Sequence, residues 1–416
     1  MSAECSAGNI PPGYKQTEVG VIPEDWDVCL LDSVANRGSG HTPDKSHPEY
    51  WGGNIKWISL QDSDRLDKLY IYDTAAKITP LGIKNSSAKM HLEGTVVLSR
   101  DAGVGKSAIM KEDMAVSQHF IAWKCGPLLN NHFLYYWLQS NKSEFERIAM
   151  GNTIKTIGLP YFRRLSIPLP TIGEQEAIAE ALSDTDALIE SFEQLIAKKR
   201  QIKQGAMQEL LTGKKRLPGF ATKAGYKHIE IGAVPEDWEV KSLGSFCEIV
   251  AGRDLVRTDF SPTDDYNHQF PIYSNSLTNK GLYGYSKSYQ YEPDKITVTA
   301  RGDIGHAFYR DVKFSAIGRL LVLSSQQQCD LRFVTEYINS FVNFALESTG
   351  VPQLTAPQIT KYVIVLPSTR AEQTAIANIL SDMDSEITTL EEKLAKARQI
   401  KQGMMQELLT GKIRLI

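Results

Sequence analysis

Two stretches of the chain carry an apolar or small side chain at alternating steps of four and three positions. This 3.5-residue period is typical of a helix that packs along a partner helix, so the sequence predicts two long amphipathic helices that form a coiled coil. The simplest partner for one helix is the other, in an antiparallel pair, and a pair formed with another chain is the alternative. The predicted contact positions are Ile178, Leu182, Thr185, Ile189, Phe192 and Ile196, and Ile376, Leu380, Met383, Ile387, Leu390 and Leu394.

The two predicted helices also share their weak points and their ends. Gly205 and Gly403 fall at equivalent positions, where glycine lowers helix stability and favours a kink. A Thr-Gly pair then follows each helix, and Gly in this position commonly terminates a helix. The pairs are Thr212-Gly213 and Thr410-Gly411.

These helices belong to a longer internal repeat. Two blocks recur without a gap, but their offsets differ, and 29 of the 44 positions in the longer block are identical. The segments between the blocks look unlike one another. The sequence therefore predicts two variable domains, each followed by a nearly identical helical segment. The longer block is 174–217 with 372–415, the shorter is 13–26 with 225–238, and the variable segments are about 27–165 and 239–363.

The variable segments predict a mixed α/β (α+β) fold with more strand than helix. Residues 94–99 and 295–299 are rich in β-branched side chains, as strands are. Each variable segment also contains a stretch with a helical period. Each ends with a stretch that resembles a strand followed by proline. The predicted domains are 13–165 and 218–363, and the predicted helical segments are 171–217 and 370–416.

Composition and charge narrow the class of protein. The chain has 46 Lys and Arg against 49 Asp and Glu, a net charge of -3, with 42% apolar residues, which is ordinary for a globular protein. Apolar runs are too short for a membrane helix, and the first residues lack a secretory pattern. The five cysteines form no CxxC pair. We therefore expect a cytoplasmic protein with reduced thiols and no metal site.

The sequence offers no catalytic motif. Gly103-Val104-Gly105-Lys106-Ser107 resembles the end of a phosphate-binding loop, but that pattern needs glycine where Arg100 stands. No arrangement pairs a nucleophile with a base, and the histidines lack the spacing of metal ligands. We expect no catalysis by this chain.

The combination of features resembles the specificity (S) subunit of type I restriction-modification enzymes. The resemblance rests on two variable domains, two repeated helices, a Pro-Glu-Asp-Trp block and a block written EQxxIA…RQIKQGxMQELLTGK, and it covers the chain from Gly13 onward. In that family each variable domain is a target recognition domain that contacts one half of a bipartite DNA site. The helices set the spacing and dock the partner subunits.

The resemblance also implies where the chemistry takes place. The subunit would bind double-stranded DNA, two methyltransferase (M) subunits and, in the full complex, two motor-nuclease (R) subunits. S-adenosylmethionine, ATP and Mg would be held by those partners, and none by this chain. A pseudo-two-fold arrangement suits two half-sites on duplex DNA, with identical partners docking on the repeated parts.

Comparison of the two variable domains selects candidate DNA contacts. An Arg-Gly turn follows a strand in both, and an alignment with one gap pairs Arg100 with Arg301. Arginine can bond guanine through two hydrogen bonds or hold a phosphate, and glycine lets the backbone approach closely. The alternative is a turn arginine paired with a neighbouring acid, Asp101 or Asp303.

Further candidates are polar side chains in the loop just before the last strand of each domain, and amides at the edges of other strands. Amides can pair with adenine, whereas the alternative is a solvated loop or an amide bonded to backbone. The full predicted set is Arg100, Gly103, Gly105, Lys106, Gln118, Thr153, Lys155 and Thr156 in the first domain, and Asn275, Ser276, Arg301, Gly305, Gln353 and Thr355 in the second.

Two other functions stay open from the sequence. One is the specificity subunit of an orphan methyltransferase that lacks the motor-nuclease. The other, more distant, is a structural tandem protein whose coiled coil joins two ligand-binding modules.

Overall fold

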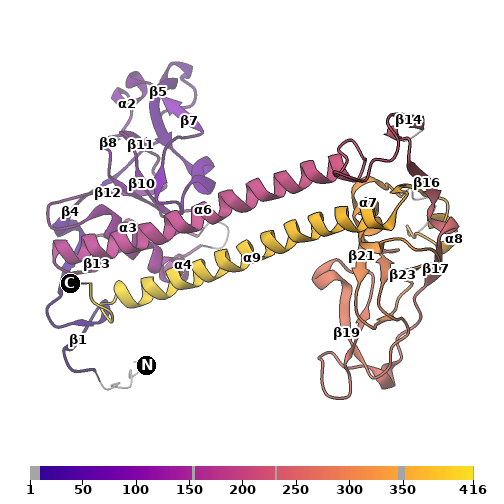
Figure 1. Cartoon of the computed structure of the whole chain (residues 1–416). Coiled ribbons are helices and arrows are strands. Elements are labelled where there is room, and N and C mark those ends of the chain that lie inside the picture. The colour runs from indigo at the N-terminus through magenta and orange to yellow at the C-terminus, as the bar shows by residue number, and fades with distance from the viewer. Residues whose placement is uncertain (1–9, 152–154, 230–231, 345–351, 416) are drawn as a thin grey trace. The chain divides into compact units, whose positions relative to one another are not determined.

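A computed structural model describes residues 10–151, 155–229, 232–344 and 352–415 (Figure 1). The chain forms two compact units. Unit 1 consists of Met1–Glu193 with Glu392–Ile416, and unit 2 of Gln194–Glu391. Each unit therefore holds one variable part together with a half of each long helix.

The two long helices are α6, Ile172–Leu210, and α9, Arg370–Leu408 (magenta and yellow in Figure 1). Each begins after a threonine whose hydroxyl accepts the backbone N–H of the glutamate three residues on, a common helix cap. Each continues without interruption through its internal glycine and ends before a glycine with a φ of 70°. The capping pairs are Thr171–Glu174 and Thr369–Glu372, both at 3.3 Å, and the terminating residues are Gly213 and Gly411.

Within each unit the two helix halves run antiparallel, which confirms the predicted pairing. Ion pairs show the direction, because the residue number rises on one helix as it falls on the other. The predicted contact positions are all buried or half-buried. The ion pairs are Asp186–Lys401 and Glu193–Arg398 in unit 1, and Arg200–Glu391 and Lys203–Asp384 in unit 2, each at 2.6 Å.

The variable part of unit 1 is built on two sheets, with strand orders β4-β12-β9-β10-β6 and β7-β5-β11-β8. The strand predicted around 94–99 is β9, and its four side chains are buried. Helix α3 packs against β9 and β10. The strands and helices are β1 Tyr14–Thr17, β2 Gly20–Pro23, β3 Asp27–Leu30, α1 Leu31–Val34, β4 Ala35–Ser39, β5 Trp51–Ile58, β6 Tyr70–Ile71, β7 Ala76–Ile78, α2 Pro80–Lys84, β8 Met90–His91, β9 Val96–Ser99, β10 Ser107–Met110, β11 Met114–Val116, β12 Phe120–Cys125, α3 Asn131–Ser140, α4 Lys142–Ile148, α5 Leu159–Phe162 and β13 Ser166–Leu169.

Unit 2 repeats this plan with smaller sheets, ordered β17-β23-β20-β21 and β19-β18-β22. The strand predicted around 295–299 is β20, and α7 packs against β20 and β21. The mixed α/β prediction is confirmed for both variable parts. The elements are β14 Tyr226–Ile229, β15 Gly232–Pro235, β16 Trp238–Ser242, β17 Cys247–Ala251, β18 Phe270–Tyr273, β19 Leu282–Ser286, β20 Lys295–Val298, β21 Ala307–Arg310, β22 Ser315–Ala316, β23 Leu321–Ser325, α7 Leu331–Phe341, α8 Ala356–Ile359 and β24 Val363–Pro367.

The repeated blocks meet at the ends of the helix pair. In unit 1, Arg414 lies beyond the end of α9 and bonds both carboxylate oxygens of Glu174, at 2.5 and 2.9 Å, and both of Asp25, at 2.8 Å. Glu174 also accepts a hydrogen bond from the Trp26 ring at 3.0 Å and is only 5% exposed. One guanidinium thus joins the start of α6, the region after α9 and the Pro-Glu-Asp-Trp block.

Unit 2 contains the equivalent set. Arg216 bonds Glu372 at 2.8 Å and Asp237 at 2.7 Å, and its guanidinium lies 5.6 Å from the Trp238 ring centre. Glu372 is 2% exposed. The same four residue types therefore close the helix pair in both units, which explains why these blocks recur.

We expect Arg414→Ala to lower the unfolding free energy by about 2–4 kcal/mol, because it leaves the buried Glu174 charge without its partner. Arg414→Lys should restore only part of the loss, since an ammonium cannot fork two carboxylates. Chemical denaturation of both variants, with the exposed Arg163→Ala as control, measures this. A loss no larger than that of the control would contradict it.

The stabilisation that comes from the pair of Arg414 with Asp25 depends on pH. The Arg414 guanidinium holds the pKa of Asp25 below its ordinary value of 3.8. The stabilisation is therefore complete above that value and is lost as the pH falls through the lowered pKa of the folded state. Arg414→Ala should be less sensitive to acid in this range than the parent chain.

The two units differ in one group beside the helix pair. In unit 2, Glu336 of α7 lies 3.8 Å from Lys203, which also pairs with Asp384. In unit 1 the equivalent ion pair is Asp186 with Lys401. It contacts Tyr136, whose hydroxyl donates a hydrogen bond to Asp186 at 2.9 Å. Burial raises the pKa of the Glu336 carboxyl despite the nearby lysine. The carboxylate of Glu336 thus costs unit 2 some stability at neutral pH.

We expect Glu336→Gln to raise the unfolding free energy at pH 8 by about 0.5–1 kcal/mol, since the amide carries no charge to bury. In the parent chain, stability should rise as the pH falls from the raised pKa towards the ordinary glutamate value, and the variant should lack this rise. Thermal unfolding across pH tests it, with the exposed Glu392→Gln as control. Destabilisation at pH 8 would show that the pairing with Lys203 outweighs burial.

Candidate nucleic-acid interface

The loop after β9 in unit 1 is a tight turn fixed by backbone hydrogen bonds. The Ser99 N–H donates to the Lys106 carbonyl at 2.8 Å, and the Gly105 N–H to the Ser99 carbonyl at 3.0 Å. Gly105 has a φ of 85°, and a Cβ there would lie 2.9 Å from the side chain of Lys142. The predicted glycine is therefore required by the turn itself and by its packing on α4.

The loop after β20 in unit 2 has the same bonds. Thr299 N–H donates to the His306 carbonyl at 3.0 Å, and Gly305 N–H to the Thr299 carbonyl at 2.8 Å. Gly305 has a φ of 93°, and a Cβ there would meet Phe344 at 2.5 Å. By these hydrogen bonds, the two turns therefore align residue for residue without a gap.

This register corrects the gapped alignment of the two turns. Ser99 corresponds to Thr299, so Arg100 corresponds to Ala300 and Asp101 to Arg301. The same loop supports the assignment, because Ile157 N–H bonds the Arg100 carbonyl at 2.9 Å as Leu354 N–H bonds the Ala300 carbonyl at 3.0 Å. The pairing of Arg100 with Arg301 was wrong, and the two arginines have different surroundings.

Arg100 is largely covered, with its side chain 19% exposed and its Nε 3.5 Å from an Asp101 carboxylate oxygen. The other Asp101 oxygen lies 2.7 Å from the Nδ1 of His119. The alternative of a turn arginine beside its neighbouring acid therefore describes Arg100. Gln118 directly precedes His119 and therefore lies close to Arg100 and Asp101. Its side-chain oxygen accepts a hydrogen bond from the Thr42 hydroxyl at 2.6 Å.

The loop before α5 completes this group. The Thr156 hydroxyl is 3.4 Å from the Arg100 carbonyl, and Lys155 is exposed beside it. The predicted Thr153 lies outside the described residues. Lys106 is turned away towards the Ser63 carbonyl, at 3.0 Å. Gly103, with a φ of 100°, belongs to the turn itself.

Hydrogen bonding at this group is incomplete. Among the described residues, the buried atoms without a hydrogen-bond partner include Oγ of Ser117, and also Nε of Arg100 and Oδ1 of Asp101, which face each other as an ion pair at 3.5 Å. Buried polar atoms in native proteins are nearly always hydrogen-bonded, and exceptions call for an explanation. Beside these loops, the hydroxyl of Ser117 is therefore a buried group that lacks a partner within the described chain.

In unit 2 the predicted residues also come together, in a different arrangement. Arg301 is exposed, and its Nη2 donates to the Gln353 side-chain oxygen at 2.9 Å. Asn275 accepts the Ala300 N–H at 2.6 Å and donates to the Gly318 carbonyl at 2.5 Å. Its amide therefore joins two loops. The alternative of an amide bonded to backbone thus describes Asn275.

Two further predicted hydroxyls stabilise local turns. Thr355 caps α8, and its hydroxyl bonds the side chain of Gln358 at 2.8 Å. The Ser276 hydroxyl accepts the Thr278 N–H at 3.2 Å. Among the predicted side chains of unit 2, Arg301 is exposed, whereas Gln353, which it bonds, is half-buried.

The sequence analysis did not identify Arg310, a buried residue that stabilises the loop around Lys280. Arg310 is 4% exposed, its guanidinium lies 3.5 Å from the Tyr273 ring centre, and it donates to the Lys280 carbonyl at 2.7 Å. Burial lowers its pKa to about 10. Asn279 and Lys280 both have left-handed backbones, a strained feature typical of functional loops. The Asn-Lys-Gly sequence was the available signal for this turn.

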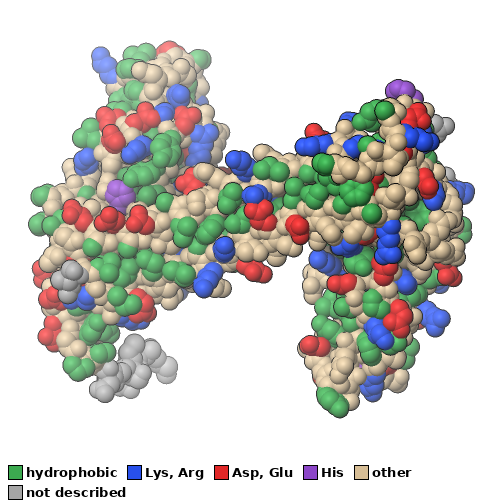
Figure 2. Space-filling model, in the orientation of Figure 1, with side chains coloured by type: hydrophobic (Ala, Val, Ile, Leu, Met, Phe, Trp, Pro, Cys, Tyr) green, Lys and Arg blue, Asp and Glu red, His purple; other side chains and the backbone are tan. Residues whose placement is uncertain are grey.

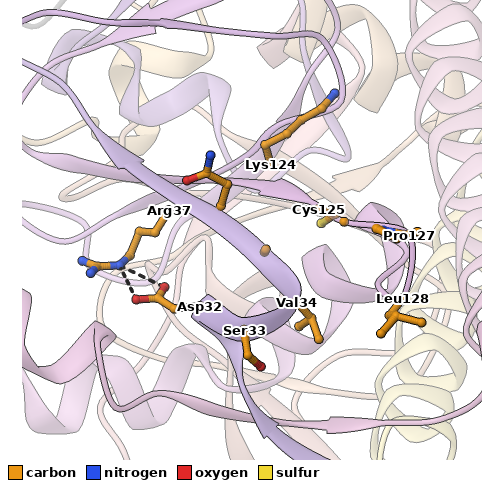
Figure 3. A pocket seen from close by; sticks show the side chains of 11 residues that line it. Asp32, Ser33, Val34, Arg37, Lys124, Cys125, Pro127 and Leu128 are labelled. Carbon is orange, nitrogen blue, oxygen red and sulfur yellow. Dashed lines mark hydrogen bonds and ion pairs between the residues drawn. The ribbon is translucent and has the colours of Figure 1, made fainter.

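A surface hollow of about 750 Å³ lies at the end of β12 away from these loops (Figure 3). In its wall, Arg37 Nε lies 3.0 Å from both carboxylate oxygens of Asp32. Burial raises the pKa of the Cys125 thiol there to about 12, so this sulfur is no thiolate at neutral pH. The hollow offers paired or protonated groups and no activated nucleophile.

The described parts of the chain carry mixed surface charge and no group of side chains suited to a metal ion. Figure 2 shows basic side chains interspersed with acidic ones over the visible face. No group of His, Cys, Asp or Glu among the described residues could hold a metal ion, and the described cysteines are free thiols. No helix in those residues has the length and apolar character needed to cross a membrane.

Comparison with known proteins assigns the family. The model for the type I restriction modification DNA specificity domain matches residues 23–201 and 235–401. The MjaIX specificity subunit of Methanocaldococcus jannaschii is 26% identical, over 97% of this chain and 96% of that protein. The EcoprrI specificity subunit of Escherichia coli is 20% identical, over 89% and 90% respectively.

A solved structure shows the same fold. The S subunit of a type I restriction-modification system from M. genitalium has a TM-score of 0.62 at 18% identity, and the match covers 92% of this chain and 96% of that one. The repeated helices and the paired variable parts thus belong to a known fold. Since the family model spans both halves of the chain, the protein belongs to the type I restriction-modification DNA specificity family.

Proposed function

We propose that this chain is the non-catalytic DNA specificity subunit of a type I restriction-modification complex in the cytoplasm. The observation that carries the proposal is the convergence, in each unit, of the turn after the central strand with neighbouring polar loops. These loops differ between the units, whereas the scaffold beneath them repeats. Each unit would therefore contact a different half of a two-part DNA target.

The repeated scaffold suits identical partners. Two methyltransferase subunits would dock on the parts that are alike, and two motor-nuclease subunits would join the full complex. Those partner subunits would bind S-adenosylmethionine, ATP and Mg. The mixed charge of this chain favours weak DNA binding alone, with further phosphate contacts supplied by the methyltransferase subunits.

The distant alternative, a structural tandem protein, has no support from the family assignment. An orphan methyltransferase would use this chain in the same way. Neighbouring genes distinguish that alternative, because only a restriction system needs a motor-nuclease subunit beside the methyltransferase.

Arg301 offers a direct test of base recognition. Arg301→Ala should weaken binding by roughly 1–3 kcal/mol if this arginine bonds guanine, with relaxed specificity at one base of one half-site. If it holds a phosphate, the loss should be even across sequences and the salt dependence shallower. Folding should change little, since the side chain is exposed.

The measurement is binding of matched and singly mismatched duplexes to the chain with its methyltransferase subunit, at two salt concentrations. Lys223→Ala, an exposed residue outside the candidate loops, is the control. Parent-like affinity, specificity and salt dependence in Arg301→Ala would show that DNA recognition in unit 2 lies elsewhere. Arg100→Ala should instead lower stability, because Arg100 is largely buried beside Asp101.

A further inference from the structure

Four exposed cations lie in adjoining loops of unit 2. One of them, Arg301, belongs to the predicted DNA contacts, and the other three were not predicted. None of the four forms an ion pair with a residue that the structure describes. We call the three additional residues the cation cluster: Arg253, Lys280 and Arg319.

Hydrogen bonds between the loops hold these cations close together. The Asn275 side chain accepts the N–H of the residue before Arg301 and donates to the carbonyl of the residue before Arg319. That second residue, Gly318, donates its own N–H to the Arg253 carbonyl at 3.1 Å. Three loops thus bring one cation each to the same part of the surface.

The fourth cation, Lys280, lies in the same loop as Asn275, and this loop is fixed at its base. The Ser274 N–H donates to the Gly281 carbonyl at 2.8 Å. The Lys280 carbonyl accepts Nη2 of Arg310 at 2.7 Å. A buried guanidinium therefore holds the backbone of Lys280, while the lysine side chain is exposed.

Two cations of the cluster stand where the backbone disfavours them. Lys280 has a φ of 51° and Arg319 a φ of 70°. Side chains with a Cβ are strained in this left-handed region, whereas glycine adopts it freely. Of the six non-glycine residues with a positive φ in the described chain, these are the two cations. A cation at a position suited to glycine indicates a use for its charge.

The charge of the cluster is not neutralised within the described chain. Two exposed aspartates, Asp254 and Asp303, lie in the same loops, and neither pairs with a described cation. Like charges that are held close together repel one another, so the arrangement is unfavourable in the free chain and favours the binding of an anion.

The candidate loops of unit 1 differ in this respect. Nε of Arg100 lies 3.5 Å from an oxygen of Asp101. Nζ of Lys106 lies 3.8 Å from an oxygen of Asp64. A cation that already faces a carboxylate gains less from a phosphate than an unpaired one. The two units therefore differ in their capacity to hold a DNA backbone.

We propose that the cation cluster binds phosphates of duplex DNA, and that unit 2 thereby supplies most of the salt-dependent affinity of the recognition loops. The inference rests on the proposed function, from which the duplex is taken. A cation that neutralises a phosphate releases counterions whatever the base sequence. The cluster therefore holds DNA of any sequence, while specificity comes from groups that face the bases.

The test uses substitutions with opposite effects on folding and on DNA binding. Lys280→Gly with Arg319→Gly should raise the melting temperature of the chain, because glycine relieves two left-handed positions. With the methyltransferase subunit present, the slope of log affinity against log salt should become shallower by about two, since each phosphate contact contributes about 0.9. The methylated target sequence and a scrambled duplex should lose affinity by the same factor.

Two control variants separate charge from backbone strain. Asn279→Gly relieves a left-handed position with a φ of 48° and removes no charge, so it should keep the parent slope. Lys287→Ala removes an exposed charge just after β19, at the end of that strand away from the cluster, and should also keep it.

Two further variants test the cluster and its location. Arg253→Gln, at a position whose backbone is not left-handed, should make the slope shallower by about one without a change in melting temperature. It tests the cluster even if the double glycine variant does not fold. In unit 1, Lys106→Ala with Lys155→Ala should reduce the slope by no more than about one. A reduction as large as that of the unit 2 variant would contradict the unequal division.

Other results reject the inference in distinguishable ways. A parent-like salt slope in the double glycine variant would overturn it. A loss of affinity confined to the target sequence would overturn it as well, because these residues would then be base contacts. If the parent complex does not prefer its target to the scrambled duplex, the proposed function itself fails. If that preference is present and the slope of every cluster variant is unchanged, only the cation cluster is rejected.

Discussion

The structure depends on one guanidinium in each unit. Arg414 bonds Glu174 and Asp25, and Arg216 bonds Glu372 and Asp237. A buried carboxylate is costly unless it is paired and hydrogen-bonded, so each glutamate fixes its arginine in place. Because the arginine follows one long helix and the glutamate begins the other, this contact sets the antiparallel register of the helix halves.

The same contact explains what recurs in the sequence and what varies. The tryptophan, aspartate, glutamate and arginine must all recur, since each is needed to close the helix pair. The turns after β9 and β20 keep their backbone bonds but not their side chains: Arg100 stands where unit 2 has Ala300, and Asp101 where it has Arg301. Two turns with the same backbone hydrogen bonds thus present different chemical groups in each unit.

Much of the fold followed from the sequence, because the helical period and the repeat are long and regular. The antiparallel pair, its contact positions and the central strands could all be predicted from these patterns. The candidate site was predicted less well. Residue types indicated the right loops, but hydrogen bonds decide the register of a turn, and the gapped alignment ignored them.

Side-chain roles depended on contacts that no local pattern contains. Asn275 and Thr355 had the right chemistry for DNA, yet both bond their own chain. Arg310 is separated by many residues from Tyr273 and Lys280, so its supporting role is visible only in three dimensions. The two glycines on the long helices looked like weak points, whereas the structure shows uninterrupted helices with open space beside them.

The central claim is that two different recognition parts act independently on one repeated scaffold. The most direct measurement is methylome sequencing of cells in which residues 27–165 are replaced by the matching segment of a relative. The account predicts that one half of the methylated sequence changes while the other half and the spacing stay as they were. A change in both halves, or in neither with methylation retained, would contradict it.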